Sequence, residues 1–154
     1  METREDRGRF DPNRIAAGGI PVPDAWNQVT DRIISAAIEV HTLLGPGLLE
    51  SLYEDALTHE LRLRGITCER QRPIRLRYKD TQLGELRLDL VVEDLVIVEI
   101  KAVERIHDVH GAQLLSYLRS ADLPIGLLIN FHQAKLVDGI TRRLNTHCTR
   151  LKLQ

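Results

Sequence analysis

The sequence is poor in several features that would assign it to a common class of protein. It contains only two cysteines, Cys68 and Cys148, and they form no C-x-x-C motif. Neither a disulfide framework nor a cysteine-based zinc site is therefore expected. No apolar run approaches the roughly 20 residues that span a bilayer, and the charged segment METREDRGRF does not resemble a signal peptide. We therefore predict a cytoplasmic protein with no membrane partner.

The chain also has a net charge close to zero and few aromatic residues. The chain has 21 Lys and Arg residues against 22 Asp and Glu residues, which gives a net charge of −1. It thus has no global attraction for polyanions, and any contact with nucleic acid has to come from a local patch. Aromatic residues make up 4% of the chain, so Leu, Ile and Val have to supply the core.

What is present is enough for one folded domain. With 154 residues, of which 43% are hydrophobic, the chain can bury a single core. We expect a flexible arm over residues 1–24 and one domain over residues 25–154. Helical spacing predicts one helix from Asp24 to the GPG turn at 45–47 and a second from about Leu48 to Arg64. The apolar face predicted for the second helix consists of Leu49, Leu52, Tyr53, Ala56, Leu57 and Leu61.

Downstream of these helices the hydrophobic period changes to that of strands. The segments IRLRYKD, LGELRLDLVV and LVIVEIKA predict three strands in an antiparallel meander. A helix is predicted in HDVHGAQLLSYLRS, and PIGLLINF is expected to return as a buried strand parallel to the third. We interpret LVDGITRRL as a strand that ends in a short helix. The predicted fold is α/β, with helices packed on a mixed sheet in the order ααβββαβ plus a C-terminal strand or short helix.

Glu99 and Lys101 interrupt the most apolar of these strands and point out of the same face. A buried charge is costly unless it is paired, binds a metal or serves chemistry. Together with Asp89 on the preceding strand, Glu99 can share a hard cation such as Mg²⁺, while Lys101 orients or deprotonates a bound water. The same three residues also fit a solvated face on which they pair with one another.

A polar stripe on the later helix gives a second signal. His110, Gln113 and Tyr117 are spaced i, i+3 and i+7, whereas leucines form the opposite, core-facing stripe. We expect the polar stripe to border the same cavity as Lys101, because this helix must fold back across the sheet. A solvated face accounts for His110 and Gln113 equally well, but less well for Tyr117.

The segment GLLESLY, from Gly47 to Tyr53, spells G-x-x-E-x-x-Y. Together with AAIEVHTLLGPGLLESLYEDAL, LDLVVEDLVIVEIKAVE and HGAQLLSYL, it closely resembles the GxxExxY protein family of the PD-(D/E)XK nuclease superfamily. The likeness covers about Val29 to Leu144. It implies a restriction-endonuclease-like core and a metal-dependent nuclease that hydrolyses DNA phosphodiester bonds with Mg²⁺ or Mn²⁺.

The resemblance also implies roles for individual residues. The expected catalytic residues are Glu50, Asp89, Glu99 and Lys101. Asp89, Glu99 and the backbone carbonyl of Ile100 would bind the metal, and Glu50 would reach it directly or through water. Substrate-positioning roles are expected for Tyr53, His110, Gln113 and Tyr117, of which the last two match a Q-x-x-x-Y signature. Leu88 stands where the superfamily's name has proline.

Other functions also fit the sequence. One is a nucleic-acid-binding or regulatory module that has the same fold but no turnover, and another is a hydrolase of small phosphate esters. The presence of all four catalytic positions favours the nuclease. The small size leaves little surface for gripping a duplex unless a homodimer or a larger partner supplies it. Arginines at every second or third position form one basic strip that could contact nucleic acid: Arg70, Arg72, Arg75 and Arg77. A solvated strand face would show the same alternation.

A metal shared by Asp89 and Glu99 is possible only with a particular pairing register of the second and third strands. A two-residue turn at residues 93–94 would pair Asp89 with Val98 and put Asp89 and Glu99 on opposite faces. A shared metal therefore requires an odd-length loop, such as residues 93–95, or a bulge between the two carboxylates.

Overall fold

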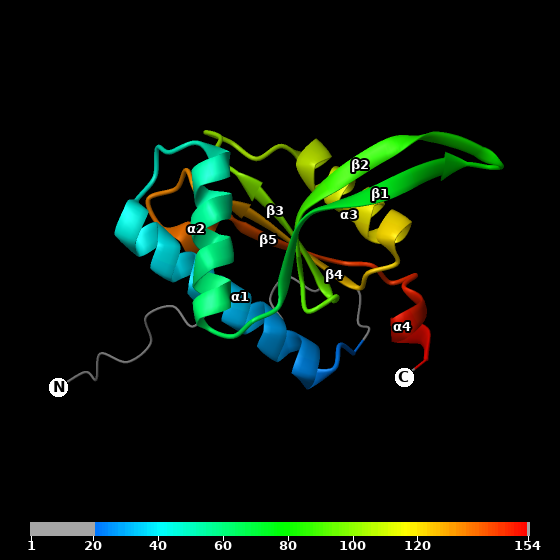
Figure 1. The fold of residues 1–154 in the computed structure, drawn as a ribbon, viewed down its shortest axis with the longest axis horizontal. Coiled ribbons are helices and arrows are strands. Elements are labelled where there is room, and N and C mark those ends of the chain that lie inside the picture. Colours follow the sequence, from blue (N-terminus) through cyan, green and yellow to red (C-terminus); the bar gives the residue numbers. More distant parts are fainter. Residues whose placement is uncertain (1–20, 154) are drawn as a thin grey trace.

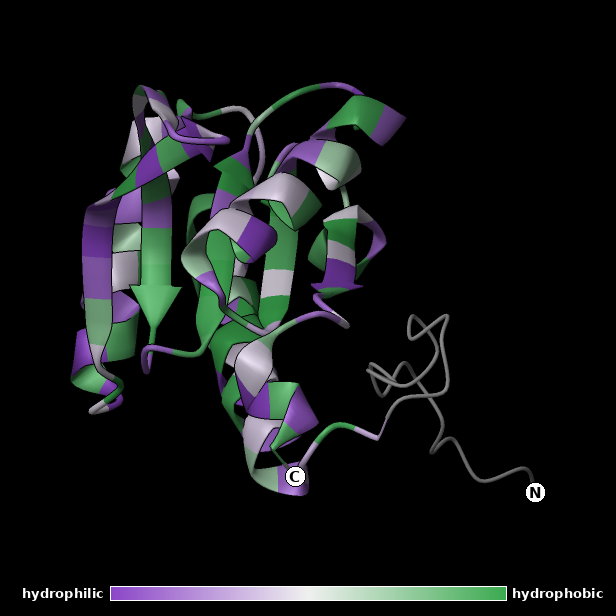
Figure 2. Cartoon of the chain, turned by 90° about the vertical axis from the view of Figure 1, so that its right-hand side faces the viewer, coloured by the Kyte–Doolittle hydropathy of each residue, from purple (hydrophilic) through white to green (hydrophobic). Residues whose placement is uncertain are grey.

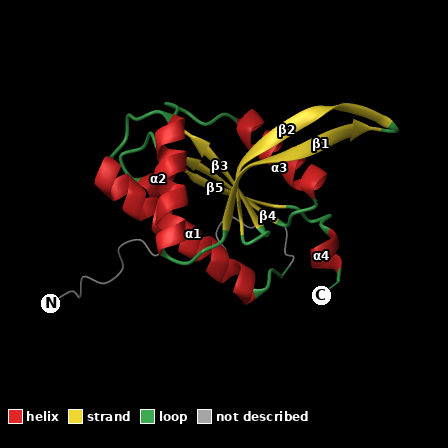
Figure 3. Cartoon of the chain, in the orientation of Figure 1, coloured by secondary structure: helices red, strands yellow, loops and turns green. Residues whose placement is uncertain are grey.

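The computed structural model describes residues 21–153, so most of the arm predicted over residues 1–24 lies outside the described residues. The elements are α1 (Asp24–Leu44), α2 (Glu50–Leu63), β1 (Cys68–Tyr78), β2 (Thr81–Val92), β3 (Val96–Lys101), α3 (Asp108–Ala121), β4 (Ile125–Asn130), the 3₁₀ helix η2 (Leu136–Gly139), β5 (Ile140–Leu144) and α4 (Thr149–Lys152) (Figures 1 and 3). Within the described residues, no helix combines the length and apolar character needed to cross a membrane.

The strands form a five-stranded mixed sheet in the order β1-β2-β3-β4-β5. β1, β2 and β3 make an antiparallel meander, β4 runs parallel to β3, and β5 runs antiparallel to β4. The predicted mixed α/β fold is confirmed, including the parallel return of the PIGLLINF strand.

The order of elements in LVDGITRRL was predicted wrongly. The helical turn η2 comes first, and β5 follows it. Gly139 explains part of the path, because a Cβ at this position would overlap the backbone carbonyl of Asn130 at the end of β4. The chain thus turns closely over the end of β4 before it enters the sheet as β5.

The buried face of α2 is narrower than the sequence predicted. Tyr53, Leu57 and Leu61 are fully buried, but Leu49 and Leu52 are 73% and 46% exposed. Leu49 precedes the helix, and Leu52 lies one position, or about 100°, away from the buried i, i+4 stripe. These two leucines therefore do not belong to the core.

Two apolar layers cover the opposite faces of the sheet (Figures 1 and 2). Val98 and Ile100 of β3 pack in the layer that contains α1 and α2. Ile97 packs in the layer that contains Leu114 and Leu118 of α3. Because side chains alternate along a strand, Glu99 shares the face of Ile97 and points toward the α3 layer.

Candidate active site

The loop between β2 and β3 has the odd length that the metal site requires. Leu90 pairs with Val98 and Val92 with Val96, so the loop comprises the three residues 93–95. Glu93 and Asp94 adopt left-handed backbone conformations, with φ of 53° and 48°. Extending this register by one residue places Asp89 opposite Glu99, and the prediction of an odd-length loop is confirmed.

β2 separates from β3 at Asp89. From this residue on, hydrogen bonds between backbone N–H groups and side chains replace the backbone hydrogen bonds between the two strands. The Asp89 N–H donates to Glu99 Oε1 at 3.3 Å, and the Ile100 N–H donates to Asp89 Oδ2 at 2.9 Å. Leu90 packs in the α1 and α2 layer whereas Leu88 packs in the α3 layer, so β2 rotates at Asp89. The two carboxyl groups therefore lie in the gap between the diverging strands.

The electrostatics of this gap disfavour two negative charges. Glu99 is only 7% exposed, and its burial, followed by the charge of Asp89, raises its pKa from 4.5 to about 8. Burial also raises the pKa of Asp89, against the lowering effect of the hydrogen bond from the Ile100 N–H. The interaction between the two carboxyl side chains lowers the pKa of Asp89 and raises that of Glu99. A cation bound here would relieve the repulsion that keeps one group protonated.

Lys101 lies at the end of β3, half-buried and on the same face as Glu99. Its positive charge lowers the pKa of both Asp89 and Glu99. Nevertheless, no carboxylate of residues 21–153 lies within ion-pair distance of its ammonium group. Because Glu99 is buried and Lys101 is unpaired among the described residues, a solvated face of mutually paired charges does not describe this site.

The loop after β3 is held by Asn130, which is fully buried at the end of β4. Its side chain accepts the Val103 N–H at 3.1 Å and donates to the Val103 carbonyl at 2.8 Å. The Phe131 N–H donates to the Lys101 carbonyl at 2.9 Å, so Lys101 turns its backbone groups toward β4. The backbone groups of Ile100 consequently face the other way, toward Asp89, and its carbonyl opens onto the gap.

Glu50 begins α2 and approaches the end of β3 from the other layer. Its Oε1 accepts the Ala102 N–H at 3.3 Å, and both residues line a cavity of about 570 Å³. Glu54, one turn further along α2, lines the same cavity, and its charge raises the pKa of Asp89. Within residues 21–153, however, no three His, Cys, Asp or Glu side chains lie close enough together to hold a metal ion.

α3 brings two of the predicted side chains toward the carboxylates. Burial, followed by the charges of Glu99 and Asp89, raises the pKa of Tyr117, while a hydrogen bond with Gln113 lowers it. Tyr117 is half-buried and lies within the electrostatic influence of the two carboxyl groups, and Gln113 beside it is exposed.

A family model of the PD-(D/E)XK nuclease superfamily matches residues 27–143, which include the gap between β2 and β3. The chain belongs to this superfamily. PD-(D/E)XK nucleases generally depend on a divalent metal. The comparison with curated proteins found no match, and the comparison with solved structures found none either.

Two residues of this PD-(D/E)XK chain for which substrate contacts are expected from the sequence also have structural roles. Tyr53 is fully buried, and its hydroxyl donates to the Gly45 carbonyl at 2.5 Å and accepts the Leu48 N–H at 3.1 Å. Tyr53 thus holds the GPG loop that precedes Glu50. His110 accepts the His107 N–H through Nδ1 at 3.0 Å and closes the first turn of α3 as part of a capping box.

Two residues beside the gap of this PD-(D/E)XK chain, Glu54 and Asn130, were not singled out in the sequence. Glu54 follows Glu50 by four residues, a spacing that places both on one face of the helix. Asn130 is the last residue of β4 and follows five apolar residues. Glu99 similarly lies two residues before the end of the apolar strand β3. The signal that singled out Glu99, a polar residue at the end of an apolar strand, would also have found Asn130.

Proposed function

We propose that the chain is a divalent-metal-dependent nuclease of the GxxExxY type that hydrolyses DNA phosphodiester bonds. The observation that carries this proposal is the pairing of Asp89 with Glu99 in the gap between β2 and β3. Glu99 is buried, and its pKa of about 8 favours a protonated carboxyl group near neutral pH. Lys101, two residues further along β3, lacks an ion-pair partner among residues 21–153. Such a set of oxygen atoms suits a hard cation such as Mg²⁺ or Mn²⁺.

Asp89, Glu99 and the Ile100 carbonyl would hold the cation. Glu50 would act through a bound water, since its carboxylate is engaged with the Ala102 N–H and forms no three-acid cluster with the other two. A divalent cation at this position lowers the pKa of a bound water and offsets negative charge on the phosphate.

The remaining residues would position the reactants. Lys101, whose side chain leaves β3 on the same face as that of Glu99, would orient the attacking water and stabilise the charge that develops on the phosphate oxygens. Tyr117, whose pKa is raised by the charges of Glu99 and Asp89 after burial, and Gln113 beside it would hold the substrate strand against the carboxylates. Tyr53 and His110 would act indirectly, through the loop before Glu50 and the start of α3.

The second candidate is a nucleic-acid-binding module that lacks turnover. The absence of a three-acid cluster among residues 21–153 favours it, because many metal sites use more than two carboxylates. The two candidates differ in whether the bond is cut, and not in whether DNA is bound.

The deciding experiment is cleavage of end-labelled DNA by the purified chain in Mg²⁺, Mn²⁺ or EDTA. We expect slow cleavage with either metal and none in EDTA. Lys101→Ala should abolish cleavage but retain metal binding by calorimetry, because both carboxylates remain. Lys135→Ala, which removes an exposed lysine in the loop before η2, is the matched control and should cut normally. DNA and metal binding without cleavage under any condition would establish the binding module instead.

A further inference from the structure

The outer part of the β1–β2 hairpin forms an arm with two different sides. Residues 73–78 of β1 and 81–87 of β2 pair only with each other, since the ladder between β2 and β3 includes Leu90 but none of these residues. This arm extends past α3 and away from the rest of the sheet (Figure 1). Ile74 and Leu88 are buried in the α3 layer, whereas the opposite side of the arm is exposed. That exposed side carries Arg75, Arg77, Glu85 and Arg87.

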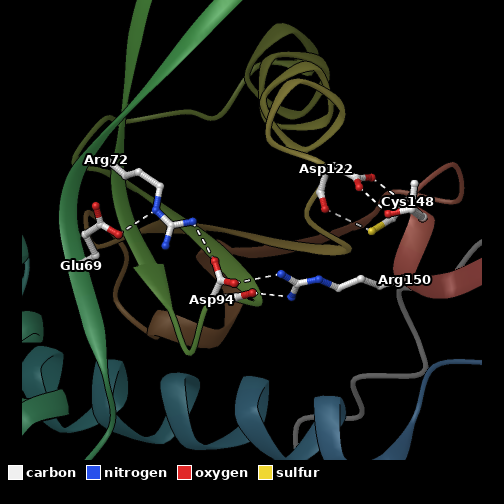
Figure 4. Close-up of polar contacts among 7 residues, drawn as sticks. Glu69, Arg72, Asp94, Asp122, Cys148 and Arg150 are labelled. Carbon is white, nitrogen blue, oxygen red and sulfur yellow. Dashed lines mark hydrogen bonds and ion pairs between the residues drawn. The ribbon is translucent and has the colours of Figure 1, made fainter.

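The arginines at the base of the hairpin are already neutralised. Arg70 contacts two carboxylates of α2 at 2.6 and 3.3 Å. Arg72 lies between Glu69 and Asp94, at 2.7 and 2.9 Å, and Asp94 in turn binds Arg150 (Figure 4). Half of the basic strip predicted from the sequence therefore serves to hold the fold together.

The arginines of the arm are not neutralised in this way. Neither Arg75 nor Arg77 has an ion-pair partner among residues 21–153, and Arg77 makes only a 3.5 Å contact to the Asp80 carbonyl. Arg87 contacts Glu85 at 3.4 Å, but these side chains are 60% and 44% exposed. An ion pair this exposed holds its partners weakly. The arm is thus a local basic patch on a chain whose net charge is −1.

The spacing of these charges suits the backbone of a nucleic acid. Side chains on one side of a strand recur every two residues, or about 6.8 Å, which matches about two phosphates of one DNA strand. Arg87 lies two residues from Asp89 on β2. A backbone that follows the exposed side therefore reaches the point where β2 rotates at Asp89 and separates from β3. The eight residues from Asp89 to the tip at Thr81 extend about 26 Å, or about eight phosphates of one strand.

We propose that the β1–β2 arm binds the DNA backbone through Arg75, Arg77 and Arg87 and guides it to the Asp89–Glu99 gap. The proposal rests on the proposed nuclease function for its choice of DNA as the polyanion. Contacts to phosphates carry no sequence information, so the arm contributes affinity independently of sequence. It also makes affinity depend on length. A DNA strand of about four nucleotides spans about 14 Å from the gap and cannot reach Arg77, which pairs with Gln82 about 23 Å along β2 from Asp89.

The test is a measurement of DNA binding by the full chain in EDTA, where no cleavage occurs. Fluorescence anisotropy with labelled 30-nucleotide single strands and duplexes gives the affinity from 50 to 300 mM salt. With a salt exponent of about 0.7 to 0.9 per contact and 1 M salt as reference, each arginine contributes about tenfold at 50 mM salt. Arg75→Ala/Arg77→Ala should therefore bind roughly a hundredfold more weakly, with a salt slope smaller by about 1.4 to 1.8.

Two further variants make this result specific. Arg62→Ala/Lys135→Ala removes the same charge from exposed positions on α2 and before η2, and it should bind like the parent. Arg75→Lys/Arg77→Lys should keep the salt slope, because a lysine also neutralises a phosphate. Thermal melts show whether each variant remains folded. If the alanine variant does not fold, Arg75→Gln/Arg77→Gln takes its place, because glutamine also removes both charges and should cause the same losses of affinity and salt slope.

The outcomes separate the arm from the nuclease function. The proposal for the arm would be overturned if the arm and control variants lost the same amount of DNA affinity. Unchanged DNA affinity after Arg75→Ala/Arg77→Ala would overturn it as well. The proposal would also be overturned if the parent protein bound neither single-stranded nor duplex DNA. In each of these cases, cleavage by the parent and its loss in Lys101→Ala still decide the nuclease function independently.

Discussion

Glu99→Gln should stabilise the metal-free protein, and increasingly so as the pH rises. The variant keeps an oxygen that can accept the Asp89 N–H, but it removes the group that resists ionisation in the gap. In the unfolded chain Glu99 loses its proton near pH 4.5, whereas in the folded protein it keeps the proton up to a pKa of about 8. Between these values the unfolded state binds fewer protons, so the stability of the parent falls as the pH rises.

The size of this effect has an upper bound. At about 1.4 kcal/mol per pKa unit, the difference between 4.5 and about 8 corresponds to at most about 5 kcal/mol at pH 8. Relaxation of the gap reduces this cost, and we expect Glu99→Gln to gain about 1–3 kcal/mol relative to the parent between pH 5 and pH 8. Such a gain is a large fraction of the roughly 5–15 kcal/mol by which a domain is stable.

The assay is urea denaturation of parent and variant in EDTA at several pH values from 5 to 8, repeated with Mg²⁺. Magnesium should stabilise the parent and leave Glu99→Gln nearly unchanged. A buried structural ion pair would instead make the variant less stable at every pH, by about 3–5 kcal/mol. That result, or curves for the two proteins that run parallel with pH, would refute the assignment of Glu99 to a metal site.

Three further predictions concern the residues around the site and the fold. Tyr53→Phe should cost about 1–2 kcal/mol of stability in urea melts, because its hydroxyl bonds to the GPG loop are lost, while metal binding persists. Asn130→Ala should cost about 1–3 kcal/mol and lower kcat, because the loop after Lys101 loses its anchor; an unchanged kcat would contradict this role. Asp94→Asn should cost up to about 1 kcal/mol at low salt, because its exposed carboxylate binds Arg72 and Arg150. These arginines hold the pKa of Asp94 below 3.8, so this stability is present above pH 3.8 and is lost as the pH falls through the lowered pKa.

The parts of the structure that could be predicted are those fixed by local pattern. The alternation in β1 and β2 and the apolar run of β3 established three strands, and the break in that run at Glu99 indicated the site. The requirement that Asp89 and Glu99 share a face then predicted the odd length of the loop between them. All of these follow from a side-chain period of two.

The parts that could not be predicted depend on contacts between distant segments. Tyr53 falls on the buried stripe of α2, but the periodicity does not show that its hydroxyl holds the loop at Gly45. Arg70 and Arg72 look like the arginines of the arm in sequence. What distinguishes them is their carboxylate partners, among which Asp55 and Asp94 lie 15 and 22 residues away in the chain. The path of LVDGITRRL was wrong for a similar reason, since η2 and Gly139 are placed by the end of β4.

The most direct test of the central claim, that Asp89 and Glu99 share a divalent cation, is the calorimetric titration of the full chain with Mn²⁺. Titrations at pH 7 in buffers of different ionisation enthalpy measure the protons released on binding. We predict that each bound ion displaces about one proton from Glu99, that this release declines toward zero by pH 9, and that Glu99→Gln abolishes binding. Absence of binding, or binding without proton release that persists in Glu99→Gln, would contradict the claim.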